Sequence, residues 1–399
     1  MGEGAPTRRD GGAAVVIIGG GAVGSAAAAY LAADPGFVGT ITVVERDPTY
    51  ARASSALSAS SIRQQFSTPE NIALSQAGLA VLRDPSWLAV DGEVPSFGLV
   101  EGGYLFLATE AGLPVLEANH RVQRQAGASV ALLTPSALTE RFAWMMSDGV
   151  AAASLGLSGE GWFDGYALMQ AFRRKARSLG VRYCADEAVG FERAGPRITA
   201  VRLASGEVLA ADQVVNAAGP WAAAVAAMAG IDVPVRARAR SVFVLHIKEA
   251  LPGCPLVIDT SGVWFRPEGH QFLCGWSPPE ADDPDDAPLE VRHDQFEEVI
   301  WPALATRVPA FEAVKVTNSW AGYYEMNTHD HNALLGRHPA CDNLWFANGF
   351  SGHGIQQAPA VGRDLAERLI HGHSRSLDLS VFDIARVIDG RRVVERNVI

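Results

Sequence analysis

The feature that most constrains the fold is an uncharged stretch of 21 residues, Ala13 to Ala33, with a run of glycines in its middle. Its first part is β-branched, from Val15 to Ile18, and its last part is mostly alanine. Its length would allow a membrane span or the core of a signal segment. The order of residue types instead predicts a strand, a tight turn and a buried helix.

The turn carries the spacing G-x-G-x-x-G at Gly19, Gly21 and Gly24. The first glycine suits the sharp turn, the second allows close approach of a pyrophosphate, and the third lets helix and strand pack closely. The N–H groups of a helix N-terminus would face the phosphates. The pattern predicts a dinucleotide site, and the alternative is an apolar helical hairpin with incidental glycines.

A second predicted strand, Thr40 to Val44, ends at Glu45, which lies 26 positions after Gly19. A carboxylate at this place binds the ribose hydroxyls of a dinucleotide and disfavours the 2′-phosphate of NADP. The fingerprint does not by itself choose between FAD and NAD.

Two further strand–glycine–helix units lie far along the chain. Strand-like 213–216 enters Ala217 to Trp221, and strand-like 344–347 enters 348–354 before a helix expected over 358–370. A hairpin is expected over 197–211. Units so widely separated imply one nucleotide domain built from distant segments, with the intervening residues forming a second domain.

These segments resemble the FAD-dependent amine and amino-acid oxidoreductases of the D-amino-acid-oxidase-like superfamily, which includes glycine oxidase, sarcosine oxidase and dimethylglycine dehydrogenase. The matching stretches are 16–45, 54–66, 214–221, 320–336 and 349–354. The resemblance is closest to a mitochondrial branch, the FAD-dependent oxidoreductase-domain proteins implicated in complex I assembly. It rests there on 62–67, 69–71, 320–325, 349–359 and 397–399.

The resemblance implies an α/β fold with a discontinuous Rossmann-like FAD-binding domain and a smaller α+β substrate domain whose sheet is mainly antiparallel. The FAD-binding domain is expected over 13–82, 150–235 and 323–372, and the substrate domain over 83–149 and 236–322. Residues 1–12 are expected to be a flexible tail and 373–399 a C-terminal extension.

The resemblance also implies the residues that hold FAD. They are Gly19, Gly21, Ala22, Val23, Gly24, Glu45, Arg46, Ser54, Ser55, Ser58, Ser60, Ser61, Val189, Ala218, Gly219, Trp221, Gly349, Phe350, Ser351, Gly352, His353, Gly354, Ile355 and Gln356. Relatives that attach flavin covalently do so through a histidine where Leu57 stands, or through a cysteine near 323–328, where none occurs. Non-covalent FAD is therefore expected.

Four residues are candidates for contact with substrate or the flavin ring. Arg63 matches a position that holds a substrate carboxylate in sarcosine-oxidase relatives, and its alternative is a solvated or internally paired arginine. Tyr323 and Tyr324 would form a wall above the flavin or belong to the core. His353 is expected beside the ring in a structural role, and Gln356 replaces a lysine that relatives place on the carboxylate.

The expected reaction moves a hydride from the carbon next to an amine onto FAD and leaves an imine. The substrate would be an amine or amino acid, and the acceptor oxygen or another compound. The strand 272–275 has no lysine of the kind that promotes reaction with oxygen in sarcosine oxidases, which slightly favours another acceptor. The alternatives are an FAD-binding assembly factor without turnover and a nicotinamide-linked dehydrogenase.

Net charge and the number of cysteines limit the expected binding partners and the expected compartment. The formal net charge is -11 and only three lysines occur, so nucleic acid is not an expected partner. Four scattered cysteines form no C-x-x-C pair, which favours a reducing cytoplasm. No metal site is expected, although His329 and His331 stand at H-x-H spacing. The acidic run 280–286 is expected to be a solvated loop.

Overall fold

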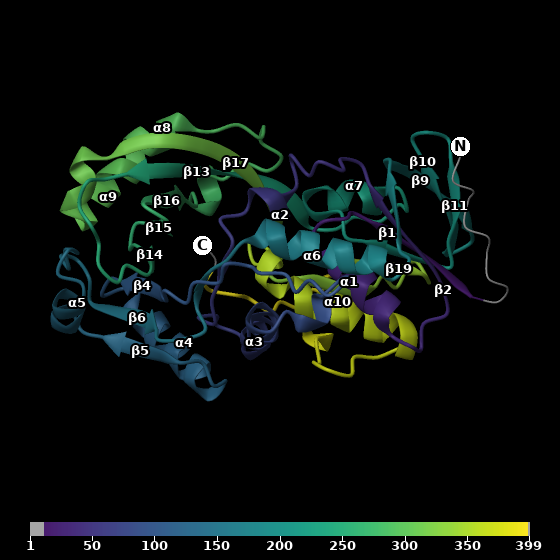
Figure 1. Ribbon diagram of the computed structural model, residues 1–399, viewed down its shortest axis with the longest axis horizontal. Coiled ribbons are helices and arrows are strands. Elements are labelled where there is room, and N and C mark those ends of the chain that lie inside the picture. The colour runs from purple at the N-terminus through teal and green to yellow at the C-terminus, as the bar shows by residue number, and fades with distance from the viewer. Residues whose placement is uncertain (1–11, 398–399) are drawn as a thin grey trace.

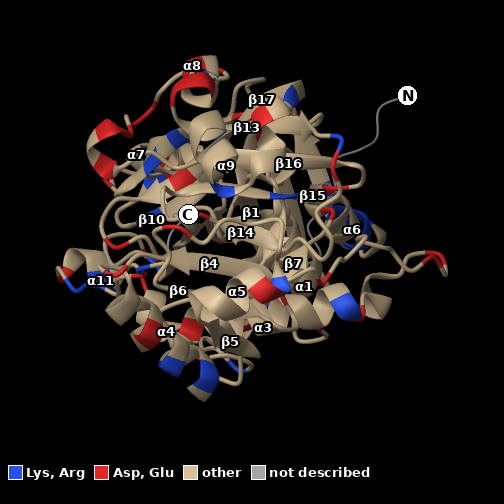
Figure 2. Ribbon diagram, turned by 90° about the vertical axis from the view of Figure 1, so that its left-hand side faces the viewer, with Lys and Arg blue, Asp and Glu red and all other residues tan. Residues whose placement is uncertain are grey.

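The computed structural model describes residues 12–397, and each of its two lobes is built around one large sheet (Figure 1). Of the expected N-terminal tail, residues 1–11 lie outside the described part. In the view of Figure 2, basic and acidic residues are interspersed over this side, and acidic residues gather around α8 (His293–Gln295). Within residues 12–397, no helix has both the length and the apolar character needed to cross a bilayer.

The first lobe holds a six-stranded sheet in which five neighbouring strands run parallel and β18 is antiparallel at one edge. In sheet order the strands are β18 (Leu334–Arg337), β19 (Leu344–Asn348), β12 (Gln213–Asn216), β1 (Ala13–Ile18), β2 (Gly39–Glu45) and β8 (Arg182–Ala185).

The β-branched run of β1 is explained by burial on both faces of this sheet. Val15 and Ile17 pack into a core shared with helices, whereas Val16 and Ile18 pack against a second layer of strands. The helices on the first face are α1 (Ala22–Ala33), α3 (Pro69–Arg83), α6 (Gly165–Ser178) and α10 (Gly354–His371). The elements on the opposite face are α7 (Ala222–Ala227) and the strands β9 (Ala188–Ala194), β10 (Arg197–Leu203) and β11 (Val208–Ala210). A sheet covered on both sides needs apolar residues at successive positions.

The alanines of α1 have an equally direct reason. Ala26 to Ala29 are buried, and α1 packs against both α10 and α6. A Cβ on Gly362 of α10 would lie 2.6 Å from the Cβ of Ala26, so the two helices meet through small residues. The expected strand, turn and buried helix over residues 13–33 are therefore confirmed, and the spanning-helix alternative is wrong.

The second lobe holds an eight-stranded sheet, antiparallel except where β14 runs parallel to β4. Its strands, in order, are β17 (Lys315–Asn327), β13 (Val235–His246), β16 (Gln271–Trp276), β15 (Val263–Glu268), β14 (Leu256–Ile258), β4 (Tyr104–Ala108), β6 (Ala152–Gly156) and β5 (Val130–Leu133). Its accompanying helices include α4 (Leu113–Gln125), α5 (Pro135–Arg141), α8 and α9 (Trp301–Arg307). Two short strands, β3 (Ser61–Ile62) and β7 (Gly161–Trp162), form a separate pair.

The long strands β13 and β17 cross the domain boundaries expected from the sequence. Their pairing runs without interruption from Val235–Asn327 to Val244–Asn318 and continues past a register shift to His246–Lys315. The strand β6, expected within the cofactor-binding segment 150–235, pairs instead with β4 and β5 of the larger sheet. Strand pairing joins distant segments, so local patterns do not reveal these edges.

The other expected elements are found with small differences. The hairpin of 197–211 and the strands at 213–216 and 344–347 are confirmed. The last long helix begins at Gly354, four residues before its expected start, and includes Pro359.

A fully buried ion pair fixes the C-terminal segment to the residues that precede β18. Arg386, in α11 (Ala385–Ile388), donates from Nε and Nη2 to the two carboxylate oxygens of Asp330 at 2.8 and 2.9 Å. Both side chains have 0% exposure. Loss of one partner would leave the other charge buried without compensation.

We therefore expect Arg386→Met to lower the free energy of unfolding by about 3–5 kcal/mol. The matched control is Arg391→Met, because Arg391 pairs with Asp389 at side-chain exposures of 65% and 56%. That change should cost about 0–1 kcal/mol. Denaturant titration followed by circular dichroism measures both, and equal losses would contradict the assigned role of the buried pair.

Candidate functional site

The larger of two joined cavities lies at the carboxyl edge of the six-stranded sheet and has a volume of about 650 Å³. Because β1, β2 and β12 are parallel, the segments that follow them meet at this edge. The expected residues that line it are Gly19, Gly21, Ala22, Val23, Glu45, Arg46, Ser54, Ser55, Ala218, Gly219 and Trp221. Three segments predicted separately are thus brought into one cavity of ligand-binding size.

The glycines at the start of this cavity are required by close backbone contacts. Gly19 has a φ of +103°, and a Cβ there would lie 2.2 Å from the carbonyl oxygen of Ala217. A Cβ on Gly24 would lie 2.0 Å from the carbonyl oxygen of Gly19. Gly24 lies inside α1 and does not line the cavity; it allows α1 to start directly at the turn.

Charged and aromatic groups close the far end of the larger cavity. Glu45 accepts hydrogen bonds from the backbone N–H groups of Gly20 and Asp47, both at 2.9 Å. The guanidinium of Arg46 lies 3.9 Å from the ring centroid of Trp221. This contact is a cation–π interaction between two residues that were predicted from different segments.

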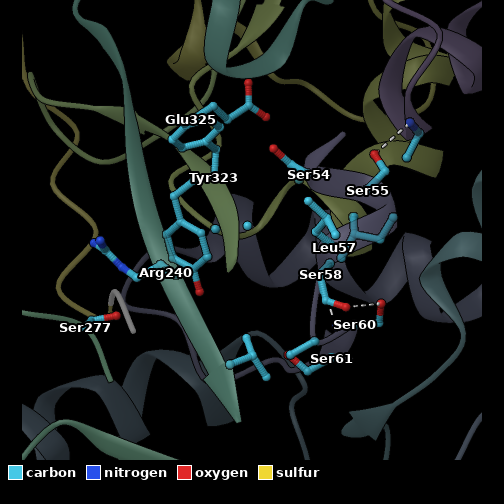
Figure 3. A pocket seen from close by; sticks show the side chains of 18 of the residues that line it. Ser54, Ser55, Leu57, Ser58, Ser60, Ser61, Arg240, Ser277, Tyr323 and Glu325 are labelled. Atoms are coloured by element: carbon cyan, nitrogen blue, oxygen red, sulfur yellow. Dashed lines mark hydrogen bonds between the residues drawn. The ribbon is translucent and has the colours of Figure 1, made fainter. Parts of the chain in front are cut away.

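The smaller cavity continues from the larger one toward the eight-stranded sheet. The expected residues along it are Ala22, Val23, Ser54, Ser55, Ser58, Ser60, Ser61, Tyr323, Tyr324, Gly352, Gly354 and Ile355. The two cavities share Ala22, Val23, Ser54, Ser55 and Glu325. We call the place where they join the waist. Figure 3 shows Ser54 and Glu325 pointing toward each other across it.

Unsatisfied polar groups show that the waist suits a polar, extended ligand. The hydroxyl of Ser54, in α2 (Ser54–Leu57), is buried and has no hydrogen-bond partner in the described structure. The hydroxyl of Ser55, by contrast, accepts the N–H of Ala22 at 3.0 Å. A buried hydroxyl without a partner is costly, so Ser54 is suited to bind a ligand atom. The residues present therefore fit a dinucleotide that passes through both cavities.

One wall of the smaller cavity is formed by β17. The hydroxyl of Tyr323 donates to the carbonyl of Ala287 at 2.8 Å. The ring of Tyr324 lies 5.1 Å from the guanidinium carbon of Arg240, which comes from β13. Arg240, Trp264 and Trp276 also line the cavity, so this wall is aromatic with one cation in it.

The structure places Arg63 away from both cavities. Its side chain is 1% exposed, stacks on Phe66 at 4.1 Å, and donates to the carbonyls of Gln65 and Asn397 and to Nε2 of His353. This arrangement matches the internally paired alternative, because the guanidinium faces protein acceptors instead of a ligand. The expected contact between Arg63 and a substrate carboxylate has no support in this geometry.

His353 and Gln356 support Arg63 from behind the cavity wall. His353 Nε2 lies 2.8 Å from Arg63 Nη2, so the imidazole must accept there and be neutral. Burial, together with the Arg63 charge, holds the pKa of His353 well below its usual range. Gln356 Oε1 accepts the backbone N–H of Arg63 at 2.9 Å.

The other expected residues are not among those that line the cavities. Phe350 lies in the helix-side core, and Ser351 accepts the N–H of Asn327 at 3.0 Å. Gly349 donates its N–H to Glu325 Oε2 at 3.1 Å. Val189 is 49% exposed on β9.

Sequence reasoning missed Glu325 and Arg240. Glu325 follows the two predicted tyrosines, and the two-residue period of a strand could have placed it on the face of Tyr323. Burial raises the pKa of Glu325 to about 8, while the N–H groups of Gly349 and Phe350 lower it by less. Arg240 had no signal, because its position depends on pairing with Gly322 in β17.

The acidic run 280–286 is not simply a solvated loop. Asp283 is buried and bonds both Arg238 and Arg240, at 3.2 and 2.6 Å. Glu280 and Asp285 also pair with Arg238. The run therefore holds two of the three arginines of β13, Arg238 and Arg240, and Arg240 lines the smaller cavity. Across residues 12–397, no cluster of three or more histidine, cysteine or acidic side chains is arranged to hold a metal ion.

Comparisons with known proteins agree with this geometry. The family model described as FAD dependent oxidoreductase (DAO) matches residues 14–368. The FAD-dependent oxidoreductase domain-containing protein 1 of Xenopus laevis is 44% identical over 394 residues, which cover 90% of this chain and 79% of that protein. The solved L-proline dehydrogenase from P. horikoshii is similar with a TM-score of 0.84 and 26% identity, covering 96% of this chain and 99% of that one.

The glycine oxidase structure from Geobacillus kaustophilus, at 22% identity, has a TM-score of 0.79 over 94% of this chain and 99% of that chain. These similarities confirm the expected α/β fold class.

The contrast between Ser54 and Ser55 gives a test of the waist. Ser54→Ala should weaken FAD binding about two- to tenfold, the value of one hydrogen bond, and leave the stability of the apoprotein unchanged. Ser55→Ala should lower both the affinity for FAD and the stability of the apoprotein, because Ser55 lines both cavities and also accepts the N–H of Ala22. Fluorescence titration with FAD and denaturant unfolding measure the two effects. Unchanged FAD affinity in Ser54→Ala would remove Ser54 from the cofactor site.

Proposed function

The chain belongs to the DAO family of FAD-dependent oxidoreductases, and from this premise we propose that it oxidises the C–N bond of an amino acid or N-substituted amino acid. The observation that carries the proposal is the pair of joined cavities. The larger one has the fingerprint and size for a dinucleotide, and the smaller one offers an aromatic wall where a substrate can meet the reactive ring.

Bound FAD would accept a hydride from the carbon next to the amine nitrogen. As the hydride leaves, the nitrogen lone pair forms the C=N bond of an iminium ion, which releases one N–H proton to water where it has one. Water then hydrolyses the product to a carbonyl compound and ammonia or an amine. The residues of this chain bind and orient the two partners. We propose that FAD is held without a covalent bond, since Leu57 and Tyr323 to Thr328 offer no histidine or cysteine at the positions that carry flavin in related enzymes.

The carboxylate of an amino-acid substrate has one suitable partner in the smaller cavity. Arg240 lines it, its two Nη atoms bond Asp283, and its Nε atom is buried without a partner in the described structure. We propose that Arg240, in place of Arg63, faces the substrate carboxylate. Charge-assisted hydrogen bonds of this kind are among the stronger polar contacts.

The electron acceptor is proposed to be a compound other than oxygen. None of the three lysines, all within the described residues, lines either cavity. Lys175 instead donates to the carbonyl of Ala89. Location in a reducing compartment such as the cytoplasm stays a prediction, supported by four free thiols.

The first test is the visible spectrum of the purified protein, recorded anaerobically after addition of sarcosine, proline and D-amino acids. We expect a flavin spectrum that bleaches with at least one of them. Bound FAD that none of a broad panel of amines reduces would support an FAD-binding protein without turnover. A protein that takes up no FAD after reconstitution would contradict the proposal, because the proposed reaction requires bound FAD.

The role of Arg240 is tested by comparing the best substrate with its uncharged amide. Arg240→Met should lower kcat/KM about 10- to 150-fold for the carboxylate form, from the loss of about 1.5–3 kcal/mol, and change the amide little. The control is Arg238→Met, since Arg238 holds the same acidic loop but does not line the cavities. Equal preference for the two forms in wild type and Arg240→Met would contradict the assignment.

A further inference from the structure

Glu325 occupies the one place that a ligand spanning both cavities must pass. It lines the larger and the smaller cavity and faces Ser54 across the waist (Figure 3). Glycine backbone from two segments, the loop after β12 and the loop after β19, also lies next to its carboxyl. A Cβ on Gly354 would lie 3.3 Å from Oε1, a Cβ on Gly219 would lie 3.9 Å from Oε2, and the N–H of Gly349 donates to Oε2.

The carboxyl is held by backbone and not by a cation. Its Oε2 accepts one backbone N–H at 3.1 Å, and the salt bridges within residues 12–397 do not include it. Glu325 is partly buried in the cavity wall, where a carboxylate without a counter-charge is disfavoured relative to its protonated form. Burial accordingly raises the pKa of Glu325 to about 8.

Other titratable and charged groups face the waist or line the cavities that meet there. From the adjoining elements they are Tyr323 and Tyr324 on β17 and Arg240 on β13, while Arg238 on β13 and His353 before α10 lie nearby without lining either cavity. Along the larger cavity they are Glu45, Arg46, Asp47, Tyr50, Arg52, Asp186 and Glu187. Arg238 and Arg240 are occupied by the acidic run, and His353 is neutral against Arg63.

We propose that Glu325 is the proton-carrying residue of the cofactor site, and that the chain binds FAD only when this carboxyl is protonated. The larger cavity has the glycine turn that would hold the two phosphates of FAD, and an ionised carboxylate at the waist would add repulsion in a site of low polarity. The protonated carboxyl also has an O–H that can donate to the ligand, which a carboxylate lacks. Ionisation of Glu325 and binding of FAD therefore compete.

The sign of the resulting pH dependence follows from this competition. Below about pH 7 nearly all of the apoprotein carries the protonated form, and the apparent Kd for FAD is constant. As pH rises through 8, the competent fraction falls, and the apparent Kd increases about twofold at pH 8 and about elevenfold at pH 9. Binding at pH 8 to 9 must also take up a proton from solution.

The experiment titrates the apoprotein with FAD between about pH 6.5 and 9.5, which brackets the raised pKa of Glu325. Quenching of flavin fluorescence reports binding. We expect Glu325→Gln to abolish the rise in Kd, because the amide keeps a donor and cannot ionise. Glu187→Gln is the control, since Glu187 lines the same larger cavity but its side chain is 54% exposed. It should keep the wild-type pH dependence.

A measurement on the wild type alone guards against a variant that does not fold. Calorimetric titration at pH 8.5 in two buffers of different ionisation enthalpy gives the number of protons taken up with FAD. Uptake of more than half a proton per FAD is about what a group of this pKa requires. No uptake, a flat Kd in the wild type, or the same slope in Glu325→Gln would each overturn the proposal.

The inference rests on FAD binding and not on the proposed reaction. The readouts are a dissociation constant and a proton count, and neither uses a substrate. Failure of every amine to reduce the flavin would leave the inference standing, and absence of proton uptake would leave C–N oxidation untouched.

Discussion

The close approach of three backbone segments at the end of β1 is the contact on which the rest of the site depends. The carbonyl of Ala217 lies where a side chain of Gly19 would begin, and the carbonyl of Gly19 lies where a side chain of Gly24 would begin. This contact lets α1 start at the turn while the segment after β12 crosses beside it. The turn at Gly19 thus lies directly beside the segment that starts at Ala217, and both line the larger cavity. Trp221 of that segment lies over the guanidinium of Arg46.

The hydrogen-bond acceptors of Arg63 and Arg240 also shape the site. Arg63 lies among carbonyls, including that of Asn397 near the C-terminal end of the described residues, and Asn397 itself bonds Gln65 and Asn119. Glu395 extends the same attachment to Ser67 and Asn71. The C-terminal segment thus completes the packing around Arg63. Arg240 is held at the edge of the smaller cavity, and its Nε has no hydrogen-bond partner among the described residues.

These placements connect the proposed reaction with the electrostatics of the cavities. Asp283 balances much of the charge of Arg238 and Arg240, so the substrate end offers a directed hydrogen bond more than a strong field. The waist, in contrast, has a carboxyl whose charge is suppressed by burial. In the function that we propose, a cofactor with phosphate groups and a substrate with a carboxylate occupy adjoining cavities, and a protonated Glu325 between them adds no repulsion.

Much of this protein was determined by the sequence alone, because the relevant signals are local. The strand–glycine–helix order of residues 13–33, the carboxylate at Glu45 and the serine run after β2 are short-range patterns, and each predicted a residue that lines the cavities. The resemblance to FAD-dependent oxidoreductases rested on these segments and on 214–221, 320–336 and 349–354. Only the tertiary structure decided which arginine reaches the cavity, that the acidic run pairs with Arg238 and Arg240, and that Glu325 lies at the waist. Those outcomes depend on the pairing of β13 with β17 and on burial by distant segments, and no local pattern records which charges such contacts will bring together.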